Sequence, residues 1–334
     1  MTLQRRRVAR LALGTLAALG GIAGSGTAAA QGSAAPYPSR PITLIVPTAP
    51  GGTTDISARM LAEPLGKALG QSVVVDNKGG GNGAIAALAV KRAEPDGHTL
   101  LMQYSGYHVI TPHVSKQKPQ WEAEDFRAVA NVLSAPQVIV VRDTVPAKNM
   151  AELIAYAKAN PGKMTYASSG NGSLQHVTGA MLEQQAGIQL THVPYKGTGP
   201  ALQDLLGGQV DMTFGTPPPF MQHIASGKLR ALAVTGKTRL ASLPNVPTAA
   251  EAGLPRLDAT SWFAVFAPAK TPQPVVDRLS SEIAKLMAVP AFQQKAAEQG
   301  ATADYMDPKK LGDYSKSELA RWGEVVKASK IEGD

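Results

Sequence analysis

The sequence contains no cysteine, which excludes disulfide bonds, a thiolate nucleophile and a lipid-modified cysteine anchor. Its six histidines show no H-x-x-x-H spacing, so we expect no metal site. It also lacks the G-x-x-x-x-G-K-[ST] motif of a P-loop and the G-x-S-x-G motif of common α/β hydrolases. Beyond the first ten residues Lys and Arg are scattered with no basic run, which argues against a nucleic-acid partner.

The N-terminal segment has the pattern of a secretory signal peptide. Four arginines lie within residues 5–10, no charged residue follows until Arg40, and Ala28 to Ala30 form a small-x-small cleavage site. We expect residues 1–30 to be removed, and the alternative of a retained membrane helix is weaker because the run is rich in Gly and Ala. The segment 4–8 loosely resembles a twin-arginine signal, which leaves the export route open. Loss of the four arginines changes the formal charge from +8 to +4, and we expect a protein free in the periplasm.

The rest of the chain alternates short β-like runs with helical ones, which predicts an α/β fold. We expect largely parallel sheets, with strands at 42–46, 72–75, 99–103, 137–141, 164–167, 190–194, 209–214, 229–235 and 261–266. We expect helices at 54–69, 83–92, 150–159, 174–185, 200–206, 274–288 and 308–328. About 300 residues remain after export, which is enough for two lobes with separate cores. The strands at 137–141 and 261–266 bracket an inner block, so we expect lobe 1 to comprise 37–138 plus 250–334 and lobe 2 to comprise 139–249, joined by two crossovers.

Five loops that follow predicted strands share a composition of Gly, Ser, Thr, Asn, Pro and Tyr. Ligands bind beyond the carboxyl ends of strands in open α/β sheets, so these loops are candidate binding elements. They cover residues 48–55, 104–108, 168–173, 195–199 and 215–219. Helix starts carry unpaired amides and the positive end of the helix dipole. The helix starts at 53 and 173, one in each lobe, are therefore predicted to hold one carboxylate, although each loop alone is also compatible with ordinary helix capping.

Other chemistries fit the sequence less well. The stretch 79–84 matches G-x-G-x-x-A, but three residues separate it from its strand and no acidic residue ends the next strand. Ser173 and His176 with Asp211 lack the sequence frame of a hydrolase, and a capping serine explains Ser173 better. Asp55 is expected to brace its own helix start rather than to act as a base. We therefore expect no cofactor and no catalytic residue.

The chain resembles the Bug-type periplasmic receptors of tripartite tricarboxylate transporters. The matching stretches run in the family's order from about residue 37 to 272, and they cover nearly the whole exported chain. They read YPSRPITLIVPTAPGGTTDISARMLA, VVDNKGGGNGAIAA, EPDGHTLL, YASSGNGSLQHVTG, VPYKGTGPALQDLLGGQVDMTF and LRALAVTGKTRLASLPNVPTAAEAGLP. The resemblance implies a type II periplasmic-binding fold with a ligand cleft between two lobes and a two-crossover hinge.

The resemblance also implies a small organic acid as ligand, with one carboxylate held by loop amides, hydroxyls and water. It places ligand-binding residues at Gly51, Gly52, Thr53, Thr54, Ser168, Gly170, Asn171, Gly172, Ser173, Tyr195, Phe214, Gly215 and Thr216. The loop after the strand at 99–103 adds Tyr104 and Ser105. The ligand could be a mono-, di- or aromatic carboxylate, passed to membrane permease subunits by a receptor that is expected to be monomeric.

One region departs from the family pattern. After Gly106 the stretch YHVITPHVSKQKPQWEAEDFR replaces a short Asn-Pro element and a Tyr-Asp-Pro turn. Tyr104, Tyr107 and His108 are large for the rim of a cleft, so an aromatic or longer acid is possible. A co-receptor that presents its ligand to a signalling protein would need the same closed form, and an enzyme using the same cleft is the least favoured alternative.

Overall fold

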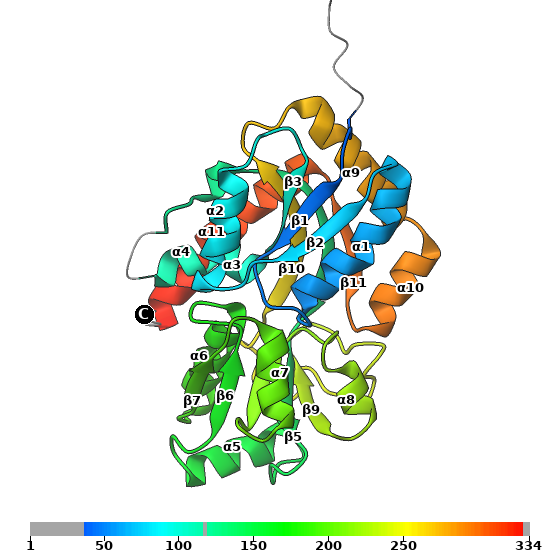
Figure 1. Ribbon diagram of the computed structural model, residues 1–334. Coiled ribbons are helices and arrows are strands. Elements are labelled where there is room, and N and C mark those ends of the chain that lie inside the picture. The colour runs from blue at the N-terminus through cyan, green and yellow to red at the C-terminus, as the bar shows by residue number, and fades with distance from the viewer. Residues whose placement is uncertain (1–36, 116–118, 330–334) are drawn as a thin grey trace, which may run out of the picture. The chain divides into compact units, whose positions relative to one another are not determined.

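The computed structural model describes residues 37–115 and 119–329. The expected signal peptide, residues 1–30, lies outside the described residues, as do positions 116–118 of the departing stretch. Two α/β lobes, each built on its own sheet, make up the described chain (Figure 1). None of the helices in these ranges combines the length and apolar character needed to cross a membrane.

Lobe 1 is built on a six-stranded sheet with strand order β11-β4-β10-β3-β1-β2. Its strands are β1 (Ile42–Val46), β2 (Val73–Asn77), β3 (Thr99–Tyr104), β4 (Phe126–Pro136), β10 (Thr260–Pro268) and β11 (Thr302–Met306). β1 pairs with β2 and β3 in parallel, whereas β10 runs antiparallel to both β3 and β4. Because β10 is buried between two neighbours, nearly every one of its side chains belongs to the core.

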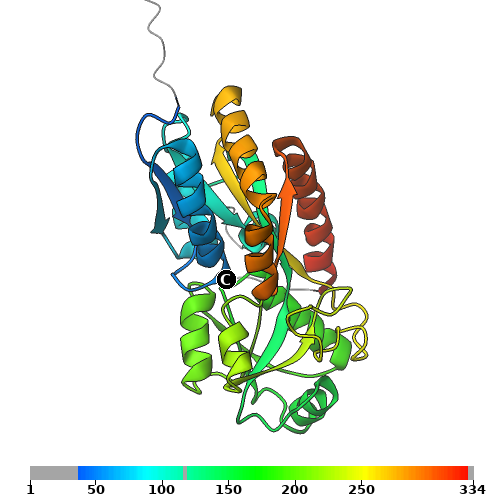
Figure 2. The same cartoon turned by 90° about the vertical axis from the view of Figure 1, so that its right-hand side faces the viewer.

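Helices cover both faces of this sheet. They are α1 (Thr53–Leu69), α2 (Ala84–Lys91), α3 (Ser105–Val109), α4 (Thr111–Val114), α9 (Gln273–Met287), α10 (Pro290–Glu298) and α11 (Pro308–Ser329), with 3-10 turns at Gly81–Gly83 and Ala123–Asp125. α1 and α9 pack against each other on one side, as Figure 2 shows in blue and gold, and α11 packs on α3 and β4. α1 presents Met60, Leu61 and Leu65 to the core, the spacing expected for one helix face.

Lobe 2 contains a five-stranded sheet with strand order β7-β6-β8-β5-β9. Its elements are β5 (Val138–Arg142), α5 (Met150–Ala159), β6 (Thr165–Ser168), α6 (Leu174–Ala186), β7 (Thr191–Pro194), α7 (Thr198–Leu206), β8 (Met212–Gly215), α8 (Met221–Ala225) and β9 (Leu229–Val234). β6 pairs in parallel with β7 and β8, so the loops after these strands leave at the same edge of the sheet. That edge faces lobe 1 (Figure 1).

The chain passes between the lobes twice, after β4 and after β9, as the two-crossover hinge requires. The first passage is Gln137, and the second is the segment 235–259 between β9 and β10. The Gln137 amide donates to the Thr235 hydroxyl in the second passage (N–Oγ1 2.9 Å). The Thr235 amide donates back to the Gln137 carbonyl at 2.8 Å, and the Thr235 hydroxyl donates to the Ala259 carbonyl at 2.5 Å. The two passages are thus joined to each other and lie close together.

The sheets are less parallel than the sequence suggested. β4 and β11 were missing from the predicted strands, and both run antiparallel to their neighbours. The strands that carry the chain between the lobes, β5 and β10, are antiparallel to their neighbours as well. β4 was missed because polar residues interrupt its apolar pattern. Two of them, Asn131 and Ser134, donate to Asp304 on β11, while Asn131 Oδ1 has no partner among the described residues. Asn131 donates to the Asp304 carbonyl at 2.7 Å, and Ser134 donates to its carboxylate at 2.7 Å.

Candidate functional site

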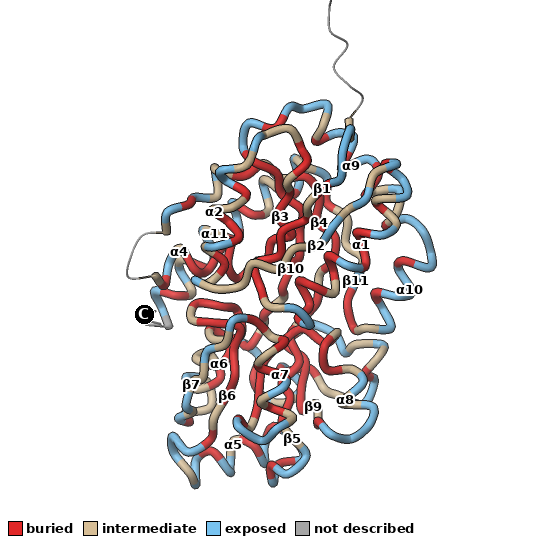
Figure 3. Tube along the Cα trace, in the orientation of Figure 1, coloured by how far each residue is buried: buried red, intermediate tan, exposed pale blue. Residues whose placement is uncertain are grey.

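The lobes contact each other directly through the loops that follow their strands. The Ala49 amide, after β1, donates to the Lys196 carbonyl, after β7, at 3.0 Å. Gly199 in the first turn of α7 allows this approach, because a Cβ there would lie 2.0 Å from the Pro50 carbonyl oxygen. Thr48, Gly52 and Gly197 of these loops are buried, whereas Pro50, Gly51 and Lys196 are exposed; Figure 3 shows buried segments in red where the lobes meet. The structure therefore has the lobes closed on each other.

A small cavity lies between the closed lobes. The centre of a water molecule can occupy about 10 Å³ of it, which is room for about one water-sized group. It is lined by Thr48, Gly52, Thr53, Thr54, Tyr104, Ser169, Gln175, Thr198, Thr216 and Phe263. None of these side chains carries a charge, so any anion held here must be held by neutral N–H and O–H groups. A whole organic acid needs more space than this, so it can enter only when the lobes part.

The start of α1 forms one wall of the cavity. The N-cap residue is Gly52, which has no side chain to occupy the first amides, and no described group accepts a hydrogen bond from the amides of Thr53 and Thr54. The Thr48 hydroxyl is buried and has no hydrogen-bond partner in the described chain. The Thr216 hydroxyl donates across the lobes to that of Thr53 at 2.6 Å. This wall thus combines free N–H donors with three hydroxyl groups.

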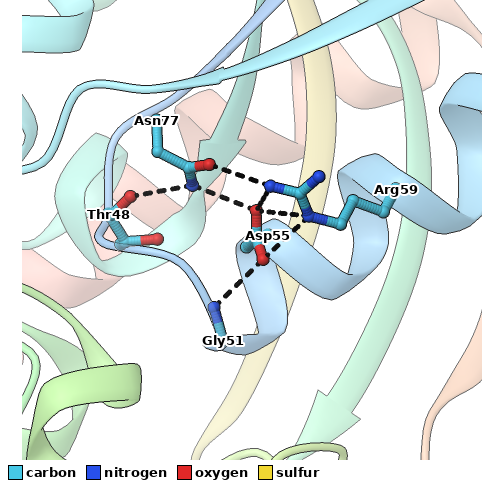
Figure 4. Close-up of polar contacts among 5 residues, drawn as sticks. All are labelled: Thr48, Gly51, Asp55, Arg59 and Asn77. Carbon is cyan, nitrogen blue, oxygen red and sulfur yellow. Dashed lines mark hydrogen bonds and ion pairs between the residues drawn. The ribbon is translucent and has the colours of Figure 1, made fainter.

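Asp55 holds the loop before α1 in place (Figure 4). Its Oδ2 accepts from the Gly51 amide at 3.0 Å, and its Oδ1 accepts from the Asn77 amide group at 3.0 Å. Asn77 also donates to the Thr48 carbonyl at 3.1 Å, and Arg59 one turn along the helix forms an ion pair with Asp55 at 3.0 Å. The prediction that Asp55 braces its own helix start is confirmed. Because Arg59 compensates its charge, the carboxylate adds little repulsion at the cavity.

The start of α6 is different, because the amides of Gly172, Leu174 and His176 already have partners within the protein and only that of Gln175 in its first turn has none among the described residues. The Leu174 amide donates to the Tyr104 hydroxyl at 3.1 Å, and the His176 amide donates to the capping Ser173 hydroxyl at 3.3 Å. The Gly172 amide donates to the imidazole Nδ1 of His176 at 3.1 Å. Ser173 therefore caps α6, which is the role that the sequence favoured over a nucleophile.

Tyr104 and Gln175 join the two lobes across the cavity. The Tyr104 hydroxyl donates to Gln175 Oε1 at 2.9 Å, and the same oxygen accepts from the Ser169 hydroxyl at 2.8 Å. Gln175 Nε2 donates to the Thr198 hydroxyl at 3.2 Å. The Tyr104 ring stacks on Phe263 with centroids 5.8 Å apart. Burial raises the pKa of Tyr104 far above its usual range, so its hydroxyl stays neutral.

A second hollow opens outside the contact between Ala49 and Lys196. Its walls are Ala49, Asn82, Gly170, Asn171, Pro194, Tyr195, Lys196 and Pro200, and its volume is about 620 Å³. The Tyr195 hydroxyl donates to the Asp204 carboxylate at 2.7 Å on the same lobe. Lys196 is the cation that borders this hollow. In the described part of the chain, no group of three or more His, Cys, Asp or Glu side chains is placed to hold a metal ion.

Known proteins share this architecture. The family model described as tripartite tricarboxylate transporter family receptor matches residues 57–331. The chain belongs to that family. The Bug-type resemblance of the sequence is confirmed, since the solved structure of the periplasmic binding protein BugD is 38% identical, with a TM-score of 0.84 over 89% of this chain and 100% of BugD.

Two further receptor structures were solved with ligands. Rpa4515 of R. palustris, with adipate, is 35% identical, with a TM-score of 0.86 over 89% of this chain and 99% of its own. MatC of Rhodopseudomonas palustris, with bound malate, is 32% identical, with a TM-score of 0.82 over 87% of this chain and 100% of its own. The chain therefore has the two-lobed periplasmic-binding fold, and membership of this receptor family makes it a solute-binding protein of the periplasmic class rather than an enzyme.

The residues predicted for this receptor from sequence fall into three groups. Gly52, Thr53, Thr54, Tyr104 and Thr216 line the cavity between the lobes. Gly170, Asn171 and Tyr195 line the outer hollow. The others line neither space. Gly51 is exposed on the loop before α1 and donates to Asp55. The remaining ones are buried, where they pack or form internal hydrogen bonds; they are Ser105, Ser168, Gly172, Ser173, Phe214 and Gly215.

The cavity also includes residues that the sequence-based prediction omitted. Thr48, Ser169 and Thr198 belong to the loops recognised in the sequence, so loop membership was the available signal. Gln175 is the second residue of α6, and helical side chains lean toward the N-terminus, which brings its amide group back to the cavity. Phe263 lies inside β10 opposite Tyr104 in the ladder, and nothing in an apolar strand distinguishes it from an ordinary core residue.

Proposed function

We propose that the cleft captures a small organic acid and holds one carboxylate at the start of α1. The observation that carries this proposal is a set of hydrogen-bond donors without protein acceptors on one wall. They are the amides of Thr53 and Thr54 in the first helical turn and the buried Thr48 hydroxyl. A helix of 17 residues places the positive end of its dipole there. A carboxylate is one of the small anions that such neutral donors hold without a lysine or arginine, and the ligands of related receptors favour it over phosphate or sulfate.

Two related receptors support this ligand class. Adipate and malate, the ligands of Rpa4515 and MatC, are both small organic acids. In this chain Gly52, Thr53 and Thr54 would supply amides, and Thr48 and Thr53 would supply hydroxyl donors. The Thr216 hydroxyl, which donates to that of Thr53, would orient it. The predicted residues around α6 have internal partners, so their role is to shape the opposite wall of the cavity.

The receptor would work by opening and closing about Gln137 and the 235–259 passage, with residues 37–138 plus 250–334 and 139–249 moving as units. It would bind its acid in the periplasm after removal of residues 1–30, and then deliver it as a monomer to membrane permease subunits. The chain contains no cysteine that could carry a lipid anchor.

The first test is mass spectrometry of small molecules released by denaturing freshly purified protein, followed by titration calorimetry with the acid found. An organic acid at one per chain supports the proposal, and a nucleotide or a sugar overturns it. If nothing is released, a thermal-shift screen of mono-, di- and aromatic carboxylates takes its place. Failure of every acid to raise the melting temperature would overturn the proposal.

A further inference from the structure

Tyr104 occupies the start of α6 in the way that a ligand oxygen would. Its single hydroxyl accepts from the Leu174 amide at 3.1 Å and donates to Gln175 Oε1 at 2.9 Å. α6 has 13 residues, so its first amides would otherwise attract an anion from the cavity. Tyr104 belongs to lobe 1, and it fills this site from the opposite side of the cleft.

The Gln175 side chain on this wall is also paired. Gln175 accepts from Ser169 and donates to Thr198, so its amide group has partners at both ends. Above it the Tyr104 ring stacks on Phe263, which gives an apolar surface. Gly106 makes room for the ring, because a Cβ there would lie 2.6 Å from a Tyr104 ring carbon. Tyr104 thus takes the first amide of α6, and of that helix's first three amides the one of Gln175 is left without an acceptor among the described residues, whereas neither Thr53 nor Thr54 at the start of α1 gives its amide to a protein group.

Resting on the proposed function, we infer that Tyr104 determines specificity by restricting the cleft to acids with a single carboxylate. The first carboxylate binds at the start of α1. A second carboxylate that reached the α6 wall would find the Leu174 amide already bonded to Tyr104 and would meet a neutral hydroxyl and aromatic carbon. It would lose its hydration and gain at most the Gln175 amide in return. A monocarboxylate places its apolar end on the same Tyr104 and Phe263 surface without that loss.

The preference is measurable with acids matched in length. Adipate and malate each carry two carboxylates, so a monocarboxylate preference would distinguish this receptor from the two relatives that bind them. The probes are butyrate against succinate, hexanoate against adipate, and benzoate against terephthalate, each titrated by calorimetry into the full exported chain. In the wild type we expect the monoacid of the best-bound pair to bind at least about tenfold more tightly than its diacid.

Two substitutions then test Tyr104 itself. Tyr104→Ser removes the ring and opens the α6 amides, so it should lower the monoacid-to-diacid affinity ratio by about tenfold or more. Tyr104→Phe keeps the packing, removes the hydroxyl and should lower the ratio in the same direction by a smaller factor. If the serine variant does not fold, as judged by circular dichroism, the affinity ratio of the phenylalanine variant alone tests the role of Tyr104.

The matched control is Tyr107→Phe. Tyr107 also joins the lobes, since its hydroxyl donates to the Ser169 carbonyl at 2.5 Å, but it does not line the cavity. This variant should weaken both acids alike and leave their ratio unchanged within about twofold. Equal binding of mono- and diacids by the wild type, or an unchanged ratio in a folded Tyr104 variant, overturns the assignment of Tyr104 alone. Failure of all six acids to bind overturns the proposed function and this inference together.

Discussion

The two helix starts that face each other across the cleft have similar sequences but differ in how their first amides are hydrogen-bonded. Both follow a strand and a glycine-containing loop, PGGTTD before α1 and SSGNGS before α6. At α1 a carboxylate, Asp55, braces the loop from behind and leaves the first amides free. At α6 the amides are used by Ser173, His176 and Tyr104. Loop composition therefore indicates where a helix start lies, while the neighbouring side chains decide whether it is available to a ligand.

The largest effect should come from holding the α1 loop away from lobe 2. In Gly199→Val the side chain would collide with the Pro50 carbonyl in the closed form only, so the lobes should fold and fail to close. We expect the affinity for the acid to fall by more than about 100-fold, because the bonds between the lobes are lost with closure. Small-angle scattering with saturating acid should show a larger radius of gyration than that of the wild type. Gly312→Ala on α11, where a Cβ meets nothing, is the control and should bind normally.

A smaller loss should follow removal of one hydroxyl from the α1 wall. Thr53→Val keeps the shape of the side chain and removes its cavity oxygen, so calorimetry should show affinity reduced by about 10- to 100-fold, the cost of one hydrogen bond to a charged group. Thr213→Val is the matched control, because Thr213 is equally buried in lobe 2 and donates to the Ala167 carbonyl away from the cavity. Equal losses in both variants would show that the effect is not local to α1.

Lowering the pH should destabilise lobe 2 through His192 on β7. The Ser168 hydroxyl, at the end of β6, and Nε2 of His192, on β7, lie 2.6 Å apart, and the His192 ring stacks on that of His176 in the first turn of α6. Burial, with a further contribution from His176, lowers the pKa of His192 to about 3. The unfolded chain then binds more protons than the folded one below about pH 6.5, so stability is full above that pH and is lost as the pH falls toward 3.

The measurement is the melting temperature between pH 7 and pH 5. His192→Gln should reduce the decrease in melting temperature by about 2 °C. His223→Gln is the control and should leave that decrease unchanged, because His223 is on α8, which packs on β9 at the opposite edge of the sheet from β7. A His192→Gln curve parallel to that of the wild type would contradict the assignment of part of this pH dependence to His192.

The smallest effect on binding is expected at the α6 cap. Ser173→Ala removes the hydroxyl that accepts from the His176 amide, so the free energy of unfolding should fall by about 1 kcal/mol. Ser173 does not line the cavity, so the affinity for the acid should change by less than about twofold. A loss as large as that of Thr53→Val would mean that both helix starts hold the carboxylate, as the sequence alone suggested.

Local sequence patterns predicted most of the helices and strands. Strands such as β1 and helices such as α9 and α11 lie within one or two residues of their predicted limits, because apolar spacing and a proline at the first turn are local signals. β4 could not be predicted in this way, because buried Asn131 is acceptable only with Asp304, a partner 173 residues away. The occupation of α6 by Tyr104 depends in the same way on a contact between residues 70 positions apart. Loop composition identified the region of the site, and tertiary contacts divided it into an available and an occupied half.

The hydrogen bonds between the lobes have a consequence for the timing of transport. Ala49, Thr216, Tyr104 and Tyr107 each make such a bond between protein groups. All of these bonds must break before an enclosed acid can escape, so the lifetime of the complex is set by the opening rate of the lobes as well as by the contacts of the acid itself. A receptor built in this way retains its cargo during diffusion, and rapid unloading requires a partner that binds the open form more tightly than the closed one.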